Sequence, residues 1–130
     1  MTTSITEQLG AYFAQAGGDV VAAYLFGSEA RGTAAAHSDV DVAILRGSRP
    51  APTLLAQPYA LADELGGLLG RRVDVVVLDS APPDLVHRVL RDGILVHERD
   101  RAARVRFEVA ARNAYFDLKP FLDRYRRQVA

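Results

Sequence analysis

The chain has 130 residues, of which 49% are hydrophobic and 25% charged; it has no cysteine, and its formal net charge is zero. These values are typical of one globular domain over residues 1–130 and exclude a disordered chain, and no apolar run has the length needed to cross a membrane. The N-terminus has neither a basic flank nor an apolar targeting segment, and no cysteine is present to cross-link a secreted fold, so we expect a cytoplasmic protein.

The first elements are predicted to be a helix and a buried strand. Apolar side chains recur at helical intervals between residues 5 and 16, after Ser4 and Glu7 in the spacing of a capping box, and two glycines end the pattern. Residues 20–26 then form an unbroken apolar run of strand length. Such a run is typical of a strand that is buried on both faces.

A turn follows this strand and is the first candidate binding element. Gly27 lets the backbone approach a ligand closely, and Ser28 can begin a short helix whose first backbone amides are unpaired. Unpaired amides at a helix start bind phosphate, so Gly27 and Ser28 are predicted to hold the phosphates of a nucleoside triphosphate. Arg31 is a candidate for the same role, or for an ion pair with Glu29 or Asp39, and the sequence favours neither.

Two carboxylates lead into the second buried strand, residues 40–45. Because side chains alternate along a strand, Asp39 and Asp41 are predicted to project from one face. Adjacent carboxylates repel each other unless a cation lies between them, and Mg²⁺, which keeps waters and phosphate oxygens among its ligands, suits such a pair. Ser38 precedes the pair and is predicted to hydrogen-bond either the strand end, which is the favoured role, or a phosphate.

The third strand, residues 73–78, contains a further carboxylate. A helical stripe of leucines over residues 54–69 precedes it, and Pro58 leaves the start of that helix open. Asp74 is the only polar residue in the apolar part of this strand, and we expect it to be buried. If the strand pairs with the one that carries Asp41, the three carboxylates form a site for two metal ions roughly 3.5 to 4 Å apart, as in phosphoryl displacement.

The remaining segments complete an α/β pattern. They are predicted to form a short helix reaching Arg91, a strand at residues 94–96, and one long or broken helix from about residue 100 to residue 128, kinked at Pro120. Alternating helices and strands indicate an α/β or α+β fold with a sheet of about four strands. The first 98 residues carry 7 basic and 12 acidic side chains, which leaves +5 on the C-terminal segment. We interpret its arginines as a solvated helix face rather than a nucleic-acid surface.

The spacing of these residues resembles that of a known family. Gly27-Ser28, ten further residues, Asp39-Val40-Asp41 and Asp74 on a later strand are similar to the nucleotidyltransferase superfamily that includes DNA polymerase β. The fuller string GSEARGTAAAHSDVDV and the short length resemble the minimal nucleotidyltransferase antitoxins that are paired with HEPN ribonuclease toxins. The resemblance covers most of the chain. It implies a mixed sheet with helices packed on one side, an active cleft along an open edge and a C-terminal helix.

The resemblance also implies an activity. The chain would be a magnesium-dependent adenylyltransferase that moves AMP from ATP to a tyrosine hydroxyl of a HEPN toxin, and it would form a hetero-oligomer with that toxin. Gly27 and Ser28 would bind the β and γ phosphates of ATP. Two Mg²⁺ ions on Asp39 and Asp41 would orient the triphosphate, and Asp74, as a shared ligand of the second ion, would serve the acceptor side.

Two other functions are left open. The chain could inhibit the toxin by contact alone and use its nucleotide site only for assembly, although three intact carboxylates count against this. A small-molecule nucleotidyltransferase of the aminoglycoside type is disfavoured, because 130 residues leave no room for an acceptor domain.

Overall fold

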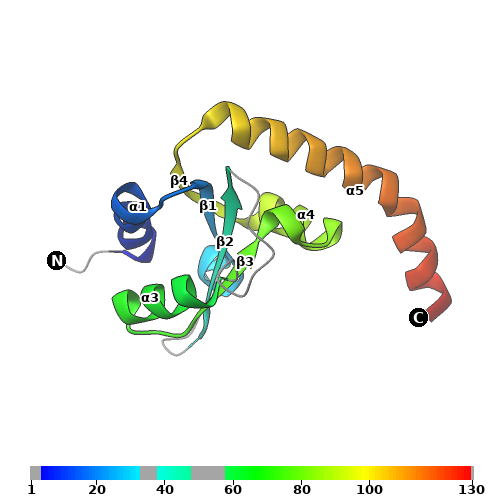
Figure 1. Cartoon of the computed structure of the whole chain (residues 1–130). Helices are drawn as coiled ribbons and strands as arrows, with labels where there is room; N and C mark the ends of the chain where they lie inside the picture. The colour runs from blue at the N-terminus through cyan, green and yellow to red at the C-terminus, as the bar shows by residue number, and fades with distance from the viewer. Residues whose placement is uncertain (1–3, 33–37, 48–57, 130) are drawn as a thin grey trace.

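The structure, a computed structural model, describes residues 4–32, 38–47 and 58–129 (Figure 1). Its elements are α1 (Ile5–Ala16), β1 (Val20–Phe26), α2 (Ser28–Arg31), β2 (Val40–Arg46), α3 (Tyr59–Leu69), β3 (Val73–Val77), the 3₁₀ turn η2 (Leu78–Ser80), α4 (Pro83–Asp92), β4 (Ile94–Glu98) and α5 (Arg101–Val129). The strands form one mixed sheet in the order β3-β2-β1-β4, in which β1 is antiparallel to β2 and β4, and β2 is parallel to β3. The predicted α/β fold with a four-stranded sheet and a C-terminal helix is confirmed.

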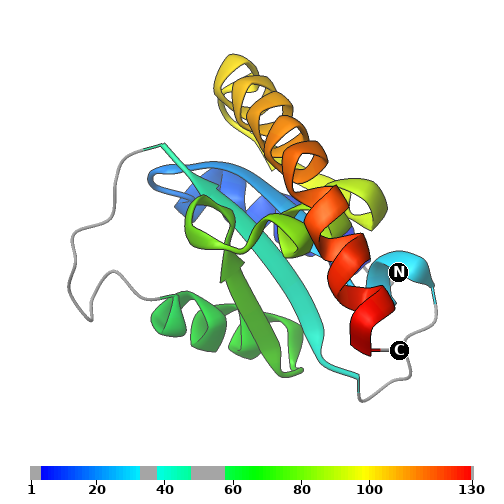
Figure 2. The ribbon, with the colours of Figure 1, turned by 90° about the vertical axis from the view of Figure 1, so that its right-hand side faces the viewer.

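Helices cover both faces of the sheet. α1 and α3 pack on one face, and α4 and the first part of α5 pack on the other (Figures 1 and 2). The expectation that helices lie on one side only is therefore wrong. β1 and β2 are buried along nearly their whole length and present apolar side chains to both faces, so each face needs a helical cover that excludes water.

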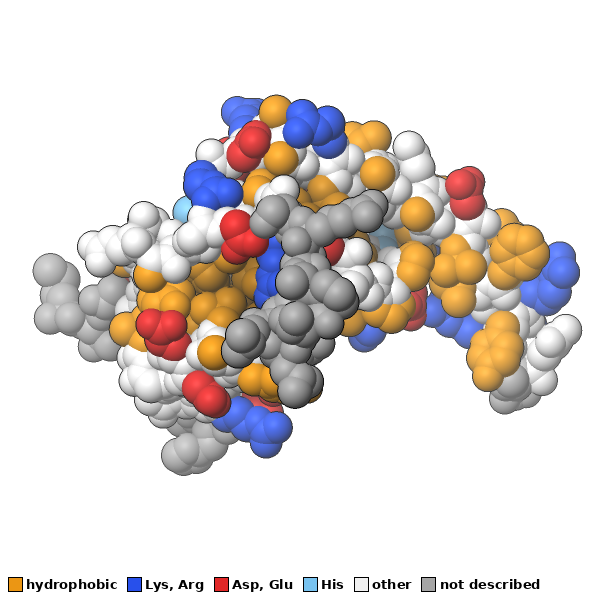
Figure 3. All heavy atoms as spheres, viewed as in Figure 1, with side chains coloured by type: hydrophobic (Ala, Val, Ile, Leu, Met, Phe, Trp, Pro, Cys, Tyr) orange, Lys and Arg blue, Asp and Glu red, His pale blue; other side chains and the backbone are white. Residues whose placement is uncertain are grey.

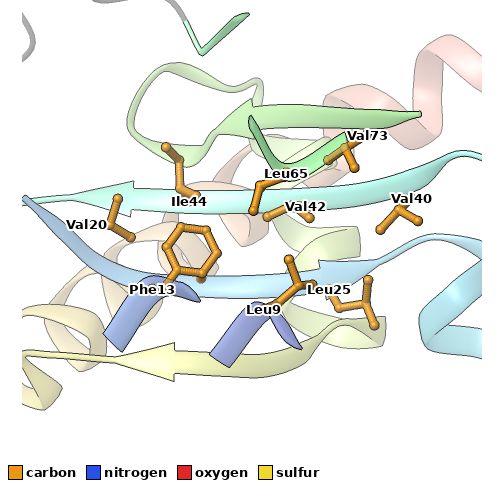
Figure 4. Packing of buried hydrophobic residues seen from close by; sticks show 10 residues of the cluster. Leu9, Phe13, Val20, Leu25, Val40, Val42, Ile44, Leu65 and Val73 are labelled. Atoms are coloured by element: carbon orange, nitrogen blue, oxygen red, sulfur yellow. The ribbon is translucent and has the colours of Figure 1, made fainter. Parts of the chain in front are cut away.

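The core consists of two hydrophobic clusters, one on each face of the sheet. On the first face, Leu9 and Phe13 of α1 and Leu65 of α3 pack against apolar residues of β1 and β2 (Figure 4). On the second face, Val86 and Val89 of α4 pack against the same two strands. Burial on both faces fixes the positions of β1 and β2, and hence of the residues at their ends.

The starts of α1 and α3 follow local sequence signals. The Ser4 hydroxyl accepts a hydrogen bond from the backbone N–H of Glu7 over 3.1 Å, as the capping box predicts. α3 begins at Tyr59, directly after Pro58. The leucines predicted to begin this helix, at positions 54 and 55, lie outside the described residues.

α5 is a single helix of 29 residues. It passes through Pro120 without a break, and Figure 1 shows it bending toward its C-terminal end, which agrees with the predicted kink. In the part of the chain that the structure describes, no helix combines the length and the apolar character that a membrane span requires.

A polar network joins α5 to the sheet. The Tyr24 hydroxyl on β1 donates a hydrogen bond of 2.8 Å to Glu108 of α5, and Glu108 also pairs with Arg104 at 2.8 Å. Arg104 pairs in addition with Glu98 on β4. Burial, together with the hydrogen bond and charge of Glu108, raises the pKa of Tyr24.

Tyr24→Phe is expected to lower the free energy of unfolding by about 1 to 2 kcal/mol, because Glu108 loses a donor in partly buried surroundings. Tyr12→Phe is the matched control: the Tyr12 hydroxyl donates a bond of the same 2.8 Å length to Glu64, but in an exposed position, so its loss should cost less. Urea denaturation of both variants measures the difference. Equal losses would show that burial does not strengthen the Tyr24 bond.

Candidate active site

The ends of three strands meet at one end of the sheet. Because β1 is antiparallel to β2, and β2 is parallel to β3, the end of β1 lies beside the beginnings of the other two strands. The register pairs Phe26 with Asp41, and Asp41 with Asp74. Gly27 and the three carboxylates therefore share one region. This region lies at the end of the sheet, and not along its open edge as expected.

Gly27 has a backbone conformation that residues with a side chain rarely adopt, with φ of 73° and ψ of −151°. A Cβ atom at this position would overlap the Oδ2 atom of Asp41. Glycine thus allows the backbone to lie directly against the carboxylate, and α2 follows at once with Ser28 as its first residue. This close approach suits a phosphate-binding turn, although phosphate binding by Gly27 and Ser28 stays a prediction.

Asp39 and Asp74 face a common cation. The Nε atom of Arg72 is 3.8 Å from Asp39 Oδ2 and 3.7 Å from Asp74 Oδ1. The predicted burial of Asp74 is wrong, because β3 is an edge strand and 49% of the Asp74 side chain is exposed. An edge position spares the carboxylate most of the cost of desolvation, which explains how an aspartate is tolerated in an otherwise apolar strand.

Asp41 is less exposed than the other two carboxylates. Its pKa is raised, first by burial and then by the negative charges of Asp74 and Asp39, while Arg31 opposes the shift. Asp39 and Asp74 are therefore close enough to Asp41 to repel its charge. Over the described ranges, no three acidic or histidine side chains are arranged as a ready-made metal site, and Asp39 and Asp74 are instead paired with Arg72.

Arg71 connects the two segments that are predicted to bind the ligand. Its guanidinium pairs with Glu29 of α2 and donates to the backbone carbonyl of Ser38, with an Nε to O distance of 3.1 Å. Ser38 is not among the described residues that line the cavity, and the predicted role of its side chain stays a prediction. Glu29 is paired with Arg71, and among the described residues no ion pair joins Arg31 to Glu29 or to Asp39.

A cavity of about 390 Å³ opens at this end of the sheet, within the size range of small-molecule sites. It is lined by Phe26, Gly27, Ser28, Arg31 and Asp41 on one side, and by Leu85, Arg88, Arg91 and Asp92 of α4 on the other. The α4 residues were not predicted as site residues. Their spacing of three to four positions places them on one face of the helix, and this spacing was the only sequence signal for them. A helical period does not reveal which segment that face packs against.

Solved structures of known proteins resemble the fold of this chain. A toxin-antitoxin crystal structure with AMP-PNP contains a chain that matches with a TM-score of 0.79 and 25% identity, over 95% of this chain and 97% of that chain. A chain assigned as a minimal nucleotidyltransferase is 33% identical, with a TM-score of 0.54, over 72% of this chain and 98% of that chain. The structure of tri-AMPylated Shewanella oneidensis HEPN toxin in complex with MNT antitoxin shows the same fold, with a TM-score of 0.73 and 22% identity over 96% and 95% of the two chains.

Sequence comparison leads to the same family. Comparison with curated proteins finds no significant match. Residues 7–102, however, match the family described as polymerase beta, nucleotidyltransferase. Because this match spans most of the chain and includes the glycine turn and all three carboxylates, the protein belongs to the polymerase β-type nucleotidyltransferase family.

Proposed function

We propose that this protein is the antitoxin of a HEPN toxin pair and that it transfers AMP from ATP to a tyrosine hydroxyl of its toxin. The observation that carries the proposal is the contact of Gly27 with Asp41 in a cavity of nucleotide size, with Asp39 and Asp74 nearby on a shared cation. The likeness to a toxin-antitoxin structure with AMP-PNP supports both the nucleotide and the partner. AMP near the ribonuclease site would add charge and bulk where RNA must bind.

The donor chemistry of Asp39, Asp41 and Asp74 suits Mg²⁺, although in the described residues the three are not gathered as a ready-made site. Carboxylate oxygens are ligands that Mg²⁺ prefers, and Asp39 and Asp74 already meet at one cation, Arg72, whose side chain is 77% exposed. Asp41 experiences the charges of both neighbours, and a divalent cation would relieve that repulsion. When bound, Mg²⁺ would neutralise charge on the triphosphate and lower the pKa of the acceptor hydroxyl.

Some residues of the site act on ATP and others on the acceptor tyrosine. Gly27 and Ser28 bind the β and γ phosphates, while Asp39 and Asp41 would orient the triphosphate through the Mg²⁺ that they hold, so that its α phosphorus faces the acceptor. Asp74, on the exposed edge strand, lies at the acceptor side. The tyrosine oxygen bonds to the α phosphorus as the bond from that phosphorus to the α–β bridging oxygen breaks. Pyrophosphate leaves, and the phenolic proton passes to solvent.

The acceptor is expected to be a protein that contacts α5. In Figure 3, hydrophobic side chains are exposed along α5 as far as its C-terminal end at the right of the view. The large exposed apolar residues of this helix are Val105, Val109, Phe116, Phe121 and Tyr125. A bound protein would remove these side chains from water, which is a favourable contribution to the complex.

The test of the proposal is transfer of AMP to the cognate toxin. The chain is incubated with Mg²⁺, ATP labelled at the α phosphate and the HEPN ribonuclease that the proposal expects a neighbouring gene to encode. We expect label on the toxin, a modified tyrosine identified by mass spectrometry, and loss of ribonuclease activity. ATP labelled at the γ phosphate is the control, because pyrophosphate carries that label away.

Three outcomes separate this proposal from its alternatives. If a triple Asp39→Asn, Asp41→Asn, Asp74→Asn variant still inhibits the toxin, the protein acts by contact alone. If an aminoglycoside is labelled in the absence of toxin, the protein is a small-molecule nucleotidyltransferase. If toxin that is present and folded receives no label, AMP transfer to it is contradicted.

A further inference from the structure

The α4 side of the cavity carries positive charge that the nucleotidyltransferase motif does not explain. Leu85, Arg88 and Arg91 recur at intervals of three residues and line the cavity opposite the glycine turn. Val86 and Val89 of the same helix are buried in the core. The apolar face of α4 thus holds the helix in place, and its arginines are presented to the cavity from a rigid element.

The two arginines of this wall differ in their protein partners. Arg91 donates two hydrogen bonds, of 2.9 and 2.8 Å, to the carboxylate of its neighbour Asp92. Arg88 makes no ion pair or hydrogen bond with any residue that the structure describes. An exposed guanidinium without a protein partner, at the rim of a cavity with an exit to solvent, is well suited to an anionic ligand.

We propose that Arg88 binds the triphosphate tail of the nucleotide and the pyrophosphate that leaves, with Arg91 assisting from its pair with Asp92. This inference rests on the proposed function, because it assigns a residue to the nucleotide of the same reaction. The β and γ phosphates then lie between the backbone amides at Gly27 and Ser28 and the guanidinium of α4. A guanidinium can donate hydrogen bonds to two phosphate oxygens at once. It therefore orients the leaving group and also neutralises part of its charge.

A second cavity supplies a matched control. It has a volume of about 120 Å³ and adjoins the same wall. Arg88 and Arg91 line both cavities, whereas Arg126 of α5 lines only the smaller of the two. Arg88 and Arg126 are both exposed, so alanine at either position removes one positive charge without creating a hole in the core. Only the change at Arg88 is expected to weaken binding of the triphosphate.

The experiment is isothermal titration calorimetry with Mg²⁺ and without toxin. The ligands are α,β-methylene-ATP, whose α–β link cannot be broken by transfer, and AMP. Arg88→Ala is expected to weaken binding of α,β-methylene-ATP roughly ten-fold and that of AMP less than about two-fold, because AMP has no β or γ phosphate. Arg88→Lys keeps the charge but not the planar fork and should restore part of the affinity. Arg126→Ala should bind both ligands as the wild type does.

The outcomes distinguish this inference from the proposed function. The assignment of Arg88 is wrong if Arg88→Ala binds α,β-methylene-ATP as tightly as the wild type does. It is also wrong if the variant's affinities for AMP and for α,β-methylene-ATP fall by the same factor, even if the toxin is labelled. If Arg88→Ala weakens binding of α,β-methylene-ATP much more than that of AMP but the toxin receives no label, the inference stands and the proposed function fails. If the wild type binds neither ligand, both are contradicted.

Discussion

The variant Asp41→Asn is expected to lose AMP transfer and yet, without metal or nucleotide, to be more thermally stable than the wild type. Transfer should fall by about 100-fold or more, because an amide is a weaker ligand than a carboxylate for the Mg²⁺ that Asp41 is proposed to hold at the triphosphate. Stability should rise because the ionised Asp41 is partly buried and is repelled by Asp74 and Asp39. Asparagine keeps nearly the same shape and removes that repulsion.

The pH dependence of stability gives a second check on Asp41. The pKa of Asp41 is raised in the folded protein, so the folded state binds its proton more tightly than the unfolded chain does. The contribution of Asp41 to stability is therefore least favourable above the raised pKa and improves as the pH falls through it. The melting temperature of Asp41→Asn should exceed that of the wild type by a few degrees at pH 7, and the gap should narrow as the pH is lowered.

Asp63→Asn controls for the loss of a negative charge. Asp63 is an exposed residue of α3 that does not line the cavity, so this variant should keep both transfer activity and wild-type stability. Melting is followed by circular dichroism in EDTA, and transfer is measured with α-labelled ATP. A lower melting temperature for Asp41→Asn would mean that Asp41 stabilises the fold through contacts that outweigh the repulsion.

Gly27→Ala is expected to have the second large effect. The new methyl group would clash with Asp41 Oδ2, so either the carboxylate or the turn must move. The backbone angles at Gly27 are also unfavourable for alanine and are expected to cost about 1 to 3 kcal/mol of stability. Because the displaced groups are those proposed to hold the triphosphate, we expect transfer per folded molecule to fall by about 100-fold or more.

Gly18→Ala separates backbone strain from displacement of Asp41. Gly18 also has a positive φ, of 57°, but a Cβ atom there would meet no other atom within 4 Å. It precedes β1, at the end of the strand remote from Gly27. This variant should therefore lose some stability and retain transfer. Comparable loss of transfer in both variants would show that strain in β1, and not the contact with Asp41, explains the effect.

Local sequence patterns predicted the main elements well. The apolar runs of β1 and β2 predicted strands buried on both faces, and both strands are buried. The capping box at Ser4 and the stop after Ala16 predicted the limits of α1. These signals are reliable because they depend on residues that are neighbours in the chain, and capping and alternation are local effects.

Two expectations were wrong because they depend on what packs against an element, and its own sequence does not determine that. The same apolar runs required cover on both faces, but the helices were expected on one face only. Asp74 was expected to be buried because its strand is apolar, yet β3 lies at the edge of the sheet. An apolar strand can be central or peripheral, and its own sequence does not state which.

The arginines of the site show the same limit more clearly. Arg71, Arg72 and Arg88 look alike in a chain with 16 basic residues. One links Glu29 to the Ser38 carbonyl, one lies between Asp39 and Asp74, and one lines the cavity. A guanidinium acquires its role from the groups within a few ångströms of it, and those groups come from distant segments.

The sequence by itself determined which chemical groups this protein possesses and in which elements they lie: a glycine turn after a buried strand, two aspartates on one face of the next strand, and a third on a later strand. The tertiary structure alone decided that these groups meet at the end of the sheet, that the third aspartate is exposed, and that α4 closes the cavity with arginines. The physical reason is that alternation and helical period order side chains along one element. Distances between elements arise only when strands pair and helices pack.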